Sequence, residues 1–136
     1  MPTMEQLLAM TTDEKGKVLI TASKNGDIET INLLLELHLN IRANHDEAMR
    51  EAAYHGQLAV VELLVANGAD IHAKNEEALA FAVRCNPNRG HIEVVKYLLE
   101  KNADIELSKI NHPSEWSSII DKTMRTYLTS IGIIIV

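Results

Sequence analysis

Histidine and cysteine are the residue types in this 136-residue chain that could hold a metal ion or act as catalytic groups. Most of the histidines fall at different positions of predicted turns, and no two have the i, i+4 spacing of a helical zinc site. The single cysteine, Cys85, has no partner for a Cys-x-x-Cys pair. The sequence therefore predicts no metal ion and no cofactor, with a metal or thiol site at Cys85 as the weakest alternative. The six histidines are His38, His45, His55, His72, His91 and His112.

Hydrolytic or nucleotide chemistry has equally little support. Ser114 follows His112 and Pro113 in a turn-forming sequence, where a serine is better explained as the N-cap of a helix. The chain has no Gly-x-Ser-x-Gly elbow, no phosphate-binding glycine loop and no dinucleotide fingerprint. We expect a protein that is not an enzyme.

Charge and hydropathy limit the possible partners and locations. Thirteen basic and nineteen acidic residues give a net charge of -6, which excludes a general attraction to nucleic acid or to anionic lipid. No stretch approaches the roughly 18 apolar residues of a membrane-spanning helix. The first residues lack the basic and apolar regions of a signal peptide, and one cysteine suits a reducing compartment. We expect a protein of the cytoplasm or of another intracellular reducing compartment.

The elements that carry these residues repeat along the chain. A shift of 30 residues moves Ala22 onto Ala52 and then onto Ala82. Beyond that point the shift becomes 34 residues and moves Asp70 onto Asp104, because a loop is lengthened after the third alanine. Matched positions in register, with one localised insertion, indicate structural repeats of one domain.

Each repeat has the pattern of two antiparallel helices. In the middle repeat we expect a first helix over 47–54 and a second over about 58–66. A break at Gly56 lets the chain turn between these two helices. The recurring Asp70 and Asp104 should accept hydrogen bonds from turn amides. Helix pairs this short cannot bury both of their faces, so neighbouring repeats must stack.

Two segments resemble the ankyrin repeat. Residues 90–99 are similar to the second helix of that family, and residues 67–71 are similar to the turn after it. The first helix departs from the family's Thr-Pro-Leu-His pattern, since Glu47-Ala48-Met49-Arg50 takes its place, and the turn between repeats is about three residues shorter. This compact form resembles repeats of giant amoebal viruses and of amoeba-associated bacteria. The resemblance implies an all-α ankyrin-repeat solenoid.

We expect a single domain over 1–136, with capping elements at both ends of the stack. A cap helix should run from Pro113 to about residue 129, and an apolar tail follows it. The expected parts are an N-terminal cap segment at 1–14, repeats at 15–44, 45–75 and 76–109, a C-terminal cap at 110–130, and the tail at 131–136.

The resemblance implies non-catalytic binding of another protein through a concave face, as an adaptor, an inhibitor or a host-directed effector. In the family this face consists of the turn tips and the exposed sides of the first helices. Tyr54 could anchor a partner or could pack on the next repeat, and both interpretations stay open. The turn tips carry Asn44, His45, Asp46, Lys74, Asn75 and Glu76. The first helices contribute Lys24, Arg50, Tyr54, His55 and Arg84.

Self-assembly is the competing hypothesis. The tail over 131–136 is uncharged, β-prone and free of proline, which is typical of a segment that pairs with another chain. We favour packing of this tail on the C-terminal cap, and therefore a monomer. If the chain is a secreted effector or a viral protein, the cytosol of a host cell is its expected location.

Overall fold

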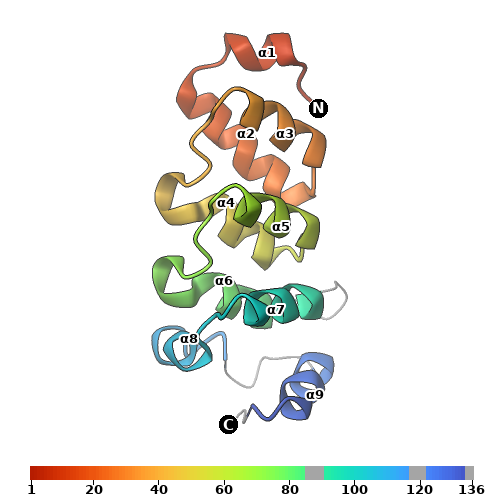
Figure 1. Ribbon diagram of the computed structural model, residues 1–136, viewed down its shortest axis with the longest axis vertical. Coiled ribbons are helices and arrows are strands. Elements are labelled where there is room, and N and C mark those ends of the chain that lie inside the picture. The colour runs from red at the N-terminus through yellow and green to blue at the C-terminus, as the bar shows by residue number, and fades with distance from the viewer. Residues whose placement is uncertain (85–90, 117–121, 134–136) are drawn as a thin grey trace.

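The computed structural model describes residues 1–84, 91–116 and 122–133, and all regular secondary structure within these ranges is α-helical. Figure 1 shows helix pairs stacked along the long axis of the molecule, which confirms the predicted all-α solenoid. The pairs are α2 with α3, α4 with α5, and α6 with α7. The helices are α1 (Met4–Ala9), α2 (Thr12–Asn25), α3 (Ile28–Glu36), α4 (Ala43–Tyr54), α5 (Leu58–Ala66), α6 (Ala73–Arg84), α7 (His91–Glu100), α8 (Ile105–Asn111) and α9 (Lys122–Ser130).

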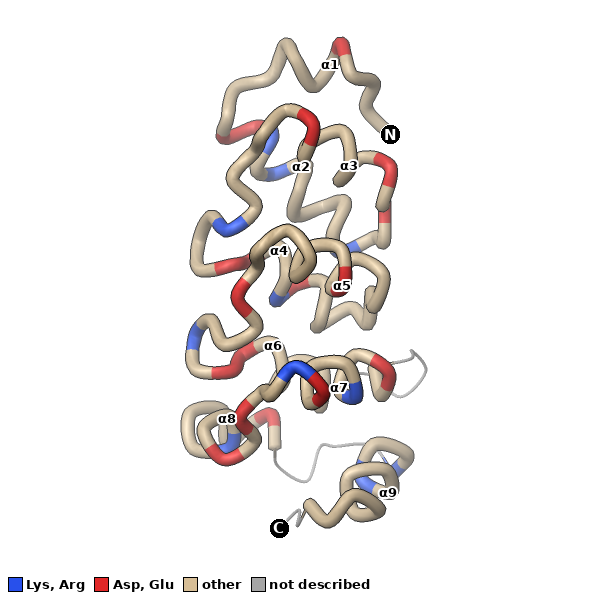
Figure 2. Tube along the Cα trace, viewed as in Figure 1, with Lys and Arg blue, Asp and Glu red and all other residues tan. Residues whose placement is uncertain are grey.

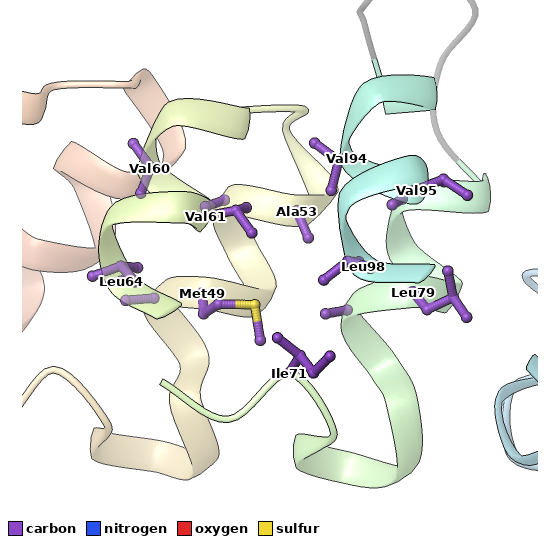
Figure 3. Packing of buried hydrophobic residues seen from close by; sticks show 14 of the residues in the cluster. Met49, Ala53, Val60, Val61, Leu64, Ile71, Leu79, Val94, Val95 and Leu98 are labelled. Atoms are coloured by element: carbon purple, nitrogen blue, oxygen red, sulfur yellow. The ribbon is translucent and has the colours of Figure 1, made fainter. Parts of the chain in front are cut away.

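The first helices of neighbouring repeats form the main contact of the stack, where α2 packs on α4, α4 on α6, and α6 on α8. Small side chains at this contact let the helices approach closely. Ala48, Ala52, Ala78 and Ala82 are each no more than 1% exposed. Larger side chains fill the space around them, and Figure 3 shows Met49 extending from α4 toward the third repeat.

The C-terminal cap differs from its prediction. Residues 113–116 form a turn, so the cap helix does not begin at Pro113. Instead α8 follows Asp104, whose carboxylate accepts a hydrogen bond from the amide of Leu107 at 2.9 Å and caps the helix. The helix α9 then covers the second half of the predicted range. The Cys85–Arg89 insertion lies outside the described residues.

Both N-terminal helices begin with a capping box. The amide of Gln6 donates to the Thr3 hydroxyl, and the amide of Glu14 donates to the Thr11 hydroxyl, each at 3.2 Å. Their N3 side chains bond back to the amides of the two threonines, at 2.9 Å and 3.2 Å. These reciprocal bonds satisfy amides that the first turn of a helix leaves unpaired. None of the helices in the described part of the chain is both long enough and apolar enough to cross a membrane.

Gly16 offers a test of the first helix, because it lies inside α2 and a Cβ added there would meet no atom within 4 Å. Gly16→Ala should raise the free energy of unfolding by about 0.5–1 kcal/mol, since alanine loses less conformational entropy on entering a helix. Gly68→Ala is the matched control. Gly68 also has open space but has a φ of +98°, so the same substitution there should lower stability by about 1 kcal/mol. Urea denaturation measures both, and a destabilised Gly16→Ala would contradict the described α2.

The second capping box should be visible in a pH titration. The amide of Thr11, and then its side chain, hold the pKa of Glu14 below its ordinary value of 4.5. Because the folded pKa is below the unfolded one, this stabilisation is fully present above pH 4.5 and is lost as the pH falls through the folded pKa. Thr11→Ala should move the pKa of Glu14 back toward 4.5. NMR titration of Glu14 measures the change, and Thr3→Ala should leave it unaffected.

Candidate functional site

Two left-handed turns project from the same side of the stack, at the starts of α4 and α6 (Figure 1). We call residues 44–46 the tip of repeat 2 and residues 74–76 the tip of repeat 3, because each tip leads into the first helix of that repeat, although it begins one or two residues before the boundary expected from the sequence. All six residues have φ between 56° and 67°, and none of them is glycine. The left-handed conformation costs about 1–2 kcal/mol per residue, so other contacts must hold each tip in place.

The third residue of each tip points inward. Asp46 is 2% exposed and Glu76 is 1% exposed. The Asp46 carboxylate accepts hydrogen bonds from Arg42 Nε at 3.3 Å and from the amide of Asp70, in the turn that follows α5, at 3.1 Å. The Glu76 carboxylate is hydrogen-bonded to Nδ1 of His72, which occupies the position of Arg42 one repeat later. Asp46 and Glu76, which we expected among the exposed turn-tip residues, are therefore buried, because these two side chains hold the tips against the stack.

Arg50 is also used within the chain. Its Nη2 donates to the carbonyl oxygen of Asn44 at 2.8 Å, and its Nε donates to that of His45 at 3.0 Å. The same guanidinium forms an ion pair with Glu77 of the third repeat, and the Arg50 side chain is only 13% exposed. The expectation that Arg50 belongs to the exposed side of its helix is wrong, because this side chain closes the tip of repeat 2.

The first two side chains of each tip remain exposed. They belong to Asn44, His45, Lys74 and Asn75. A hollow between the two tips is lined partly by three of these four residues, with His45 on one side and Lys74 and Asn75 on the other. Figure 2 shows acidic and basic positions interspersed along the stack rather than separated onto two faces.

A second exposed set lies at the ends of the first helices, where Lys24, Tyr54 and Arg84 occupy equivalent positions. Lys24 is exposed, Tyr54 is 42% exposed, and the Arg84 side chain is 46% exposed and lies 3.5 Å from Glu115. The Tyr54 ring also packs edge-on against Phe81 of the next repeat, with ring centroids 5.4 Å apart. Tyr54 is therefore partly exposed, as a partner anchor would be, and also packs on the next repeat.

His55, the neighbour of that tyrosine, is only partly exposed. Its ring packs edge-on against Tyr54, with centroids 5.1 Å apart. Its Nδ1 lies 2.9 Å from the carbonyl oxygen of Glu51. A hydrogen bond to its own helix fixes the ring, so His55 lies at the edge of the exposed set.

Polar residues that recur in the turns between repeats accept hydrogen bonds from backbone amides, as the sequence predicted for Asp70. The side chains of Asn40 and Asp70 each accept a hydrogen bond from the amide two residues later, at 3.0 Å and 2.9 Å. These bonds hold the extended turns that lead from one repeat to the next.

Sequence reasoning missed one recurring bond between repeats. Gln57 lies at the N-cap of α5 but makes no side-chain capping bond. Its Nε2 donates instead to the carbonyl oxygen of Lys24 in the preceding repeat, at 2.9 Å. One repeat later, Nε2 of His91 lies 2.8 Å from the carbonyl oxygen of Tyr54. The signal was present in the sequence, since a side chain with an Nε2 donor occupies the same repeat position twice.

The sequence analysis also considered a metal or thiol site at Cys85 and self-assembly through the apolar tail. No group of three or more histidine, cysteine, aspartate or glutamate side chains could hold a metal ion among the residues that the structure describes. Cys85 lies outside those residues. In the tail, Ile133 packs partly against the hydrophobic core and Ile131 is 46% exposed. Residues 134–136 are outside the described range, so self-assembly through the tail stays a prediction.

Arg50 and Arg84 form a matched pair for testing which side chains hold the fold. Arg50→Ala should lower the free energy of unfolding by about 2 kcal/mol, because it removes two hydrogen bonds to tip carbonyls and leaves Glu77 without its cation. Arg84→Ala should change stability by less than about 0.5 kcal/mol, since the Arg84 side chain is 46% exposed and its contact with Glu115 is long, at 3.5 Å. Arg50→Lys should not restore the loss, because an ammonium group cannot reproduce the planar set of donors. Equal effects at both positions in urea denaturation would contradict this assignment.

The comparisons with known proteins agree with this geometry. A family model described as ankyrin repeats (3 copies) matches residues 2–75 and 19–109. The human (Homo sapiens) ankyrin repeat domain-containing protein 40 is 35% identical over 77 residues, which is 57% of this chain and 20% of that protein. The chain thus spans about a fifth of the length of that relative. No solved structure matches the chain. Ankyrin repeats are generally protein–protein interaction modules and are typically non-catalytic, and this chain belongs to the ankyrin repeat family.

Proposed function

We propose that the chain binds a partner protein, without catalysis, through two sets of exposed side chains on its concave face. The surface consists of the first two residues of each tip and the exposed ends of the first helices. Its members are Asn44, His45, Lys74, Asn75, Lys24, Tyr54 and Arg84, with His55 at the edge. The buried Asp46 and Glu76 and the internally bonded Arg50 support this surface from beneath and do not belong to it.

The conformation of the tips is the observation that carries this proposal. In both repeats a strained left-handed backbone keeps two side chains exposed, while the third is buried and bonded within the stack. A fixed backbone lowers the entropy that a surface loses on binding. Strained backbone of this kind, held by surrounding contacts, is typical of binding and active sites.

Tyr54 supplies the aromatic anchor of the surface. Partly exposed tyrosines are enriched among the residues that dominate binding energy, because the ring gives a large contact area with few rotatable bonds. Its packing on Phe81 fixes the ring of Tyr54 before a partner arrives. Lys24 and Arg84 lie at the equivalent positions of the neighbouring repeats and offer charges for specificity.

We also propose that the protein acts in the cytoplasm as a monomer. Its net charge of -6 supports a protein partner rather than nucleic acid. Its single cysteine suits a reducing compartment. The partial packing of Ile133 on the core supports a tail that folds back on its own chain.

Variants of the exposed surface test the proposed function. A partner would first be captured from the native cell or its host with the wild-type chain, and its affinity then measured. His45→Ser combined with Lys74→Ser, and separately Tyr54→Ser, should each weaken that affinity by about tenfold or more, as expected for central interface residues. Circular dichroism would check that each variant keeps its helices.

Lys96→Ser is the matched control for the lysine substitution. Lys96 is an exposed lysine on α7, a second helix, where it contacts Glu93 at 3.4 Å and lies 5.3 Å from the centre of the Tyr127 ring of α9. Its substitution should leave the affinity unchanged. A partner that binds the tip variants as tightly as the wild type, or that is lost with Lys96→Ser alone, would exclude the proposed face.

A further inference from the structure

The two tips are held by different parts of the chain. In repeat 2, Arg50 from the same repeat donates to the carbonyl oxygens of Asn44 and His45. The equivalent residue of repeat 3 is Ala80, which is completely buried and carries no donor. The tip of repeat 3 has the same left-handed backbone, so its carbonyl oxygens must find their donors elsewhere.

The C-terminal unit, by which we mean α8 and the turn that follows it through Trp116, supplies those donors. Nε2 of His112 lies 2.9 Å from the carbonyl oxygen of Lys74 and 3.0 Å from that of Asn75. These are the counterparts of the two carbonyls that Arg50 bonds in repeat 2. The Ser108 hydroxyl donates to the third carbonyl oxygen, that of Glu76, at 3.3 Å.

Ser108 is itself fixed from behind. It is completely buried, and its hydroxyl oxygen accepts a hydrogen bond from Trp116 Nε1 at 2.9 Å. All three carbonyl oxygens of this tip are therefore bonded by residues that come more than thirty positions later in the chain.

We infer that His112 is a positioning residue for the tip of repeat 3, so that the C-terminal unit orders a binding surface that belongs to another repeat. The shared Nε2 donor requires the proton on that nitrogen, because both acceptors are carbonyl oxygens. Without this donor, the two hydrogen bonds that offset the cost of the left-handed backbone at Lys74 and Asn75 are lost. The consequence for partner binding rests on the proposed function, whereas the ordering of the tip does not.

Amide hydrogen exchange reads the two tips separately. The amide of Glu76 donates to the His72 carbonyl oxygen at 3.3 Å, and the amide of Asp46 donates to that of Arg42 at 3.1 Å. His112→Ala should accelerate exchange at Glu76 by about tenfold, as expected for the loss of hydrogen bonds to a strained turn. Exchange at Asp46 should stay unchanged, because Arg50 holds that tip.

His112→Gln is the rescue variant. A glutamine Nε2 can stand where a histidine Nε2 stands, and the chain already shows this exchange at Gln57 and His91, which bond equivalent carbonyl oxygens. We expect His112→Gln to restore slow exchange at Glu76. Trp116 fluorescence reports whether the C-terminal unit keeps its own packing in both variants.

The inference is overturned if His112→Ala leaves the exchange of Glu76 at its wild-type rate. It is also overturned if His112→Gln keeps the wild-type Trp116 fluorescence but does not restore the protection of Glu76, since the tip would then not depend on the donor. None of these measurements uses a partner. The ordering of the tip can therefore hold even if the surface variants show no effect on binding, and it can fail while they do.

Discussion

Contact between the first helices of successive units is the interaction on which the rest of the structure depends. Helices of 9–12 residues, paired by a tight turn, expose apolar side chains on two sides, and one pair alone cannot cover them. The alanines along α4 and α6 bring neighbouring backbones close enough for Met49 and Leu79 to fill the remaining space. This close approach also brings the amide of Asp70 within reach of Asp46. The polar bonds at the tips therefore exist because the apolar contact sets the spacing between units.

The tips show how a strained surface is maintained on such a stack. Left-handed backbone at six residues without glycine is unfavourable, and each tip offsets it with a buried carboxylate below and donors to its carbonyl oxygens. Three residues that maintain the surface, Asp46, Glu76 and Arg50, are thus charged but largely buried, and the exposed residues of the tips make few bonds. The buried supporting residues and the exposed tip residues differ in burial although they are close together in the sequence.

The repeat pattern predicted the fold well, because the spacing of Ala52, Leu64 and Gly56 directly reflects helix packing and turns. The candidate surface was only partly predictable. Asp46 and Glu76 occupy turn positions, where side chains are usually exposed to solvent. The left-handed backbone directs these two side chains inward, and their residue types do not predict that conformation. Arg50 could not be recognised as a structural residue because its acceptors are backbone carbonyls, which carry no sequence signal. The role of His112 depends on a neighbour more than thirty residues away, beyond the range of any local pattern.

The donors that hold the two tips have a consequence for exchanging repeats between proteins. Repeat 2 carries its own arginine, Arg50. Its tip would keep the left-handed conformation in a new array, provided that a backbone amide there donates to Asp46 as the amide of Asp70 does. Repeat 3 would arrive with Ala80 and no donor, and its tip would relax unless the following unit travelled with it. Repeat 2 could therefore be transferred alone, whereas repeat 3 would have to be transferred together with the C-terminal unit that follows it. Sequence boundaries drawn at the 30-residue period do not mark the boundaries of structural independence.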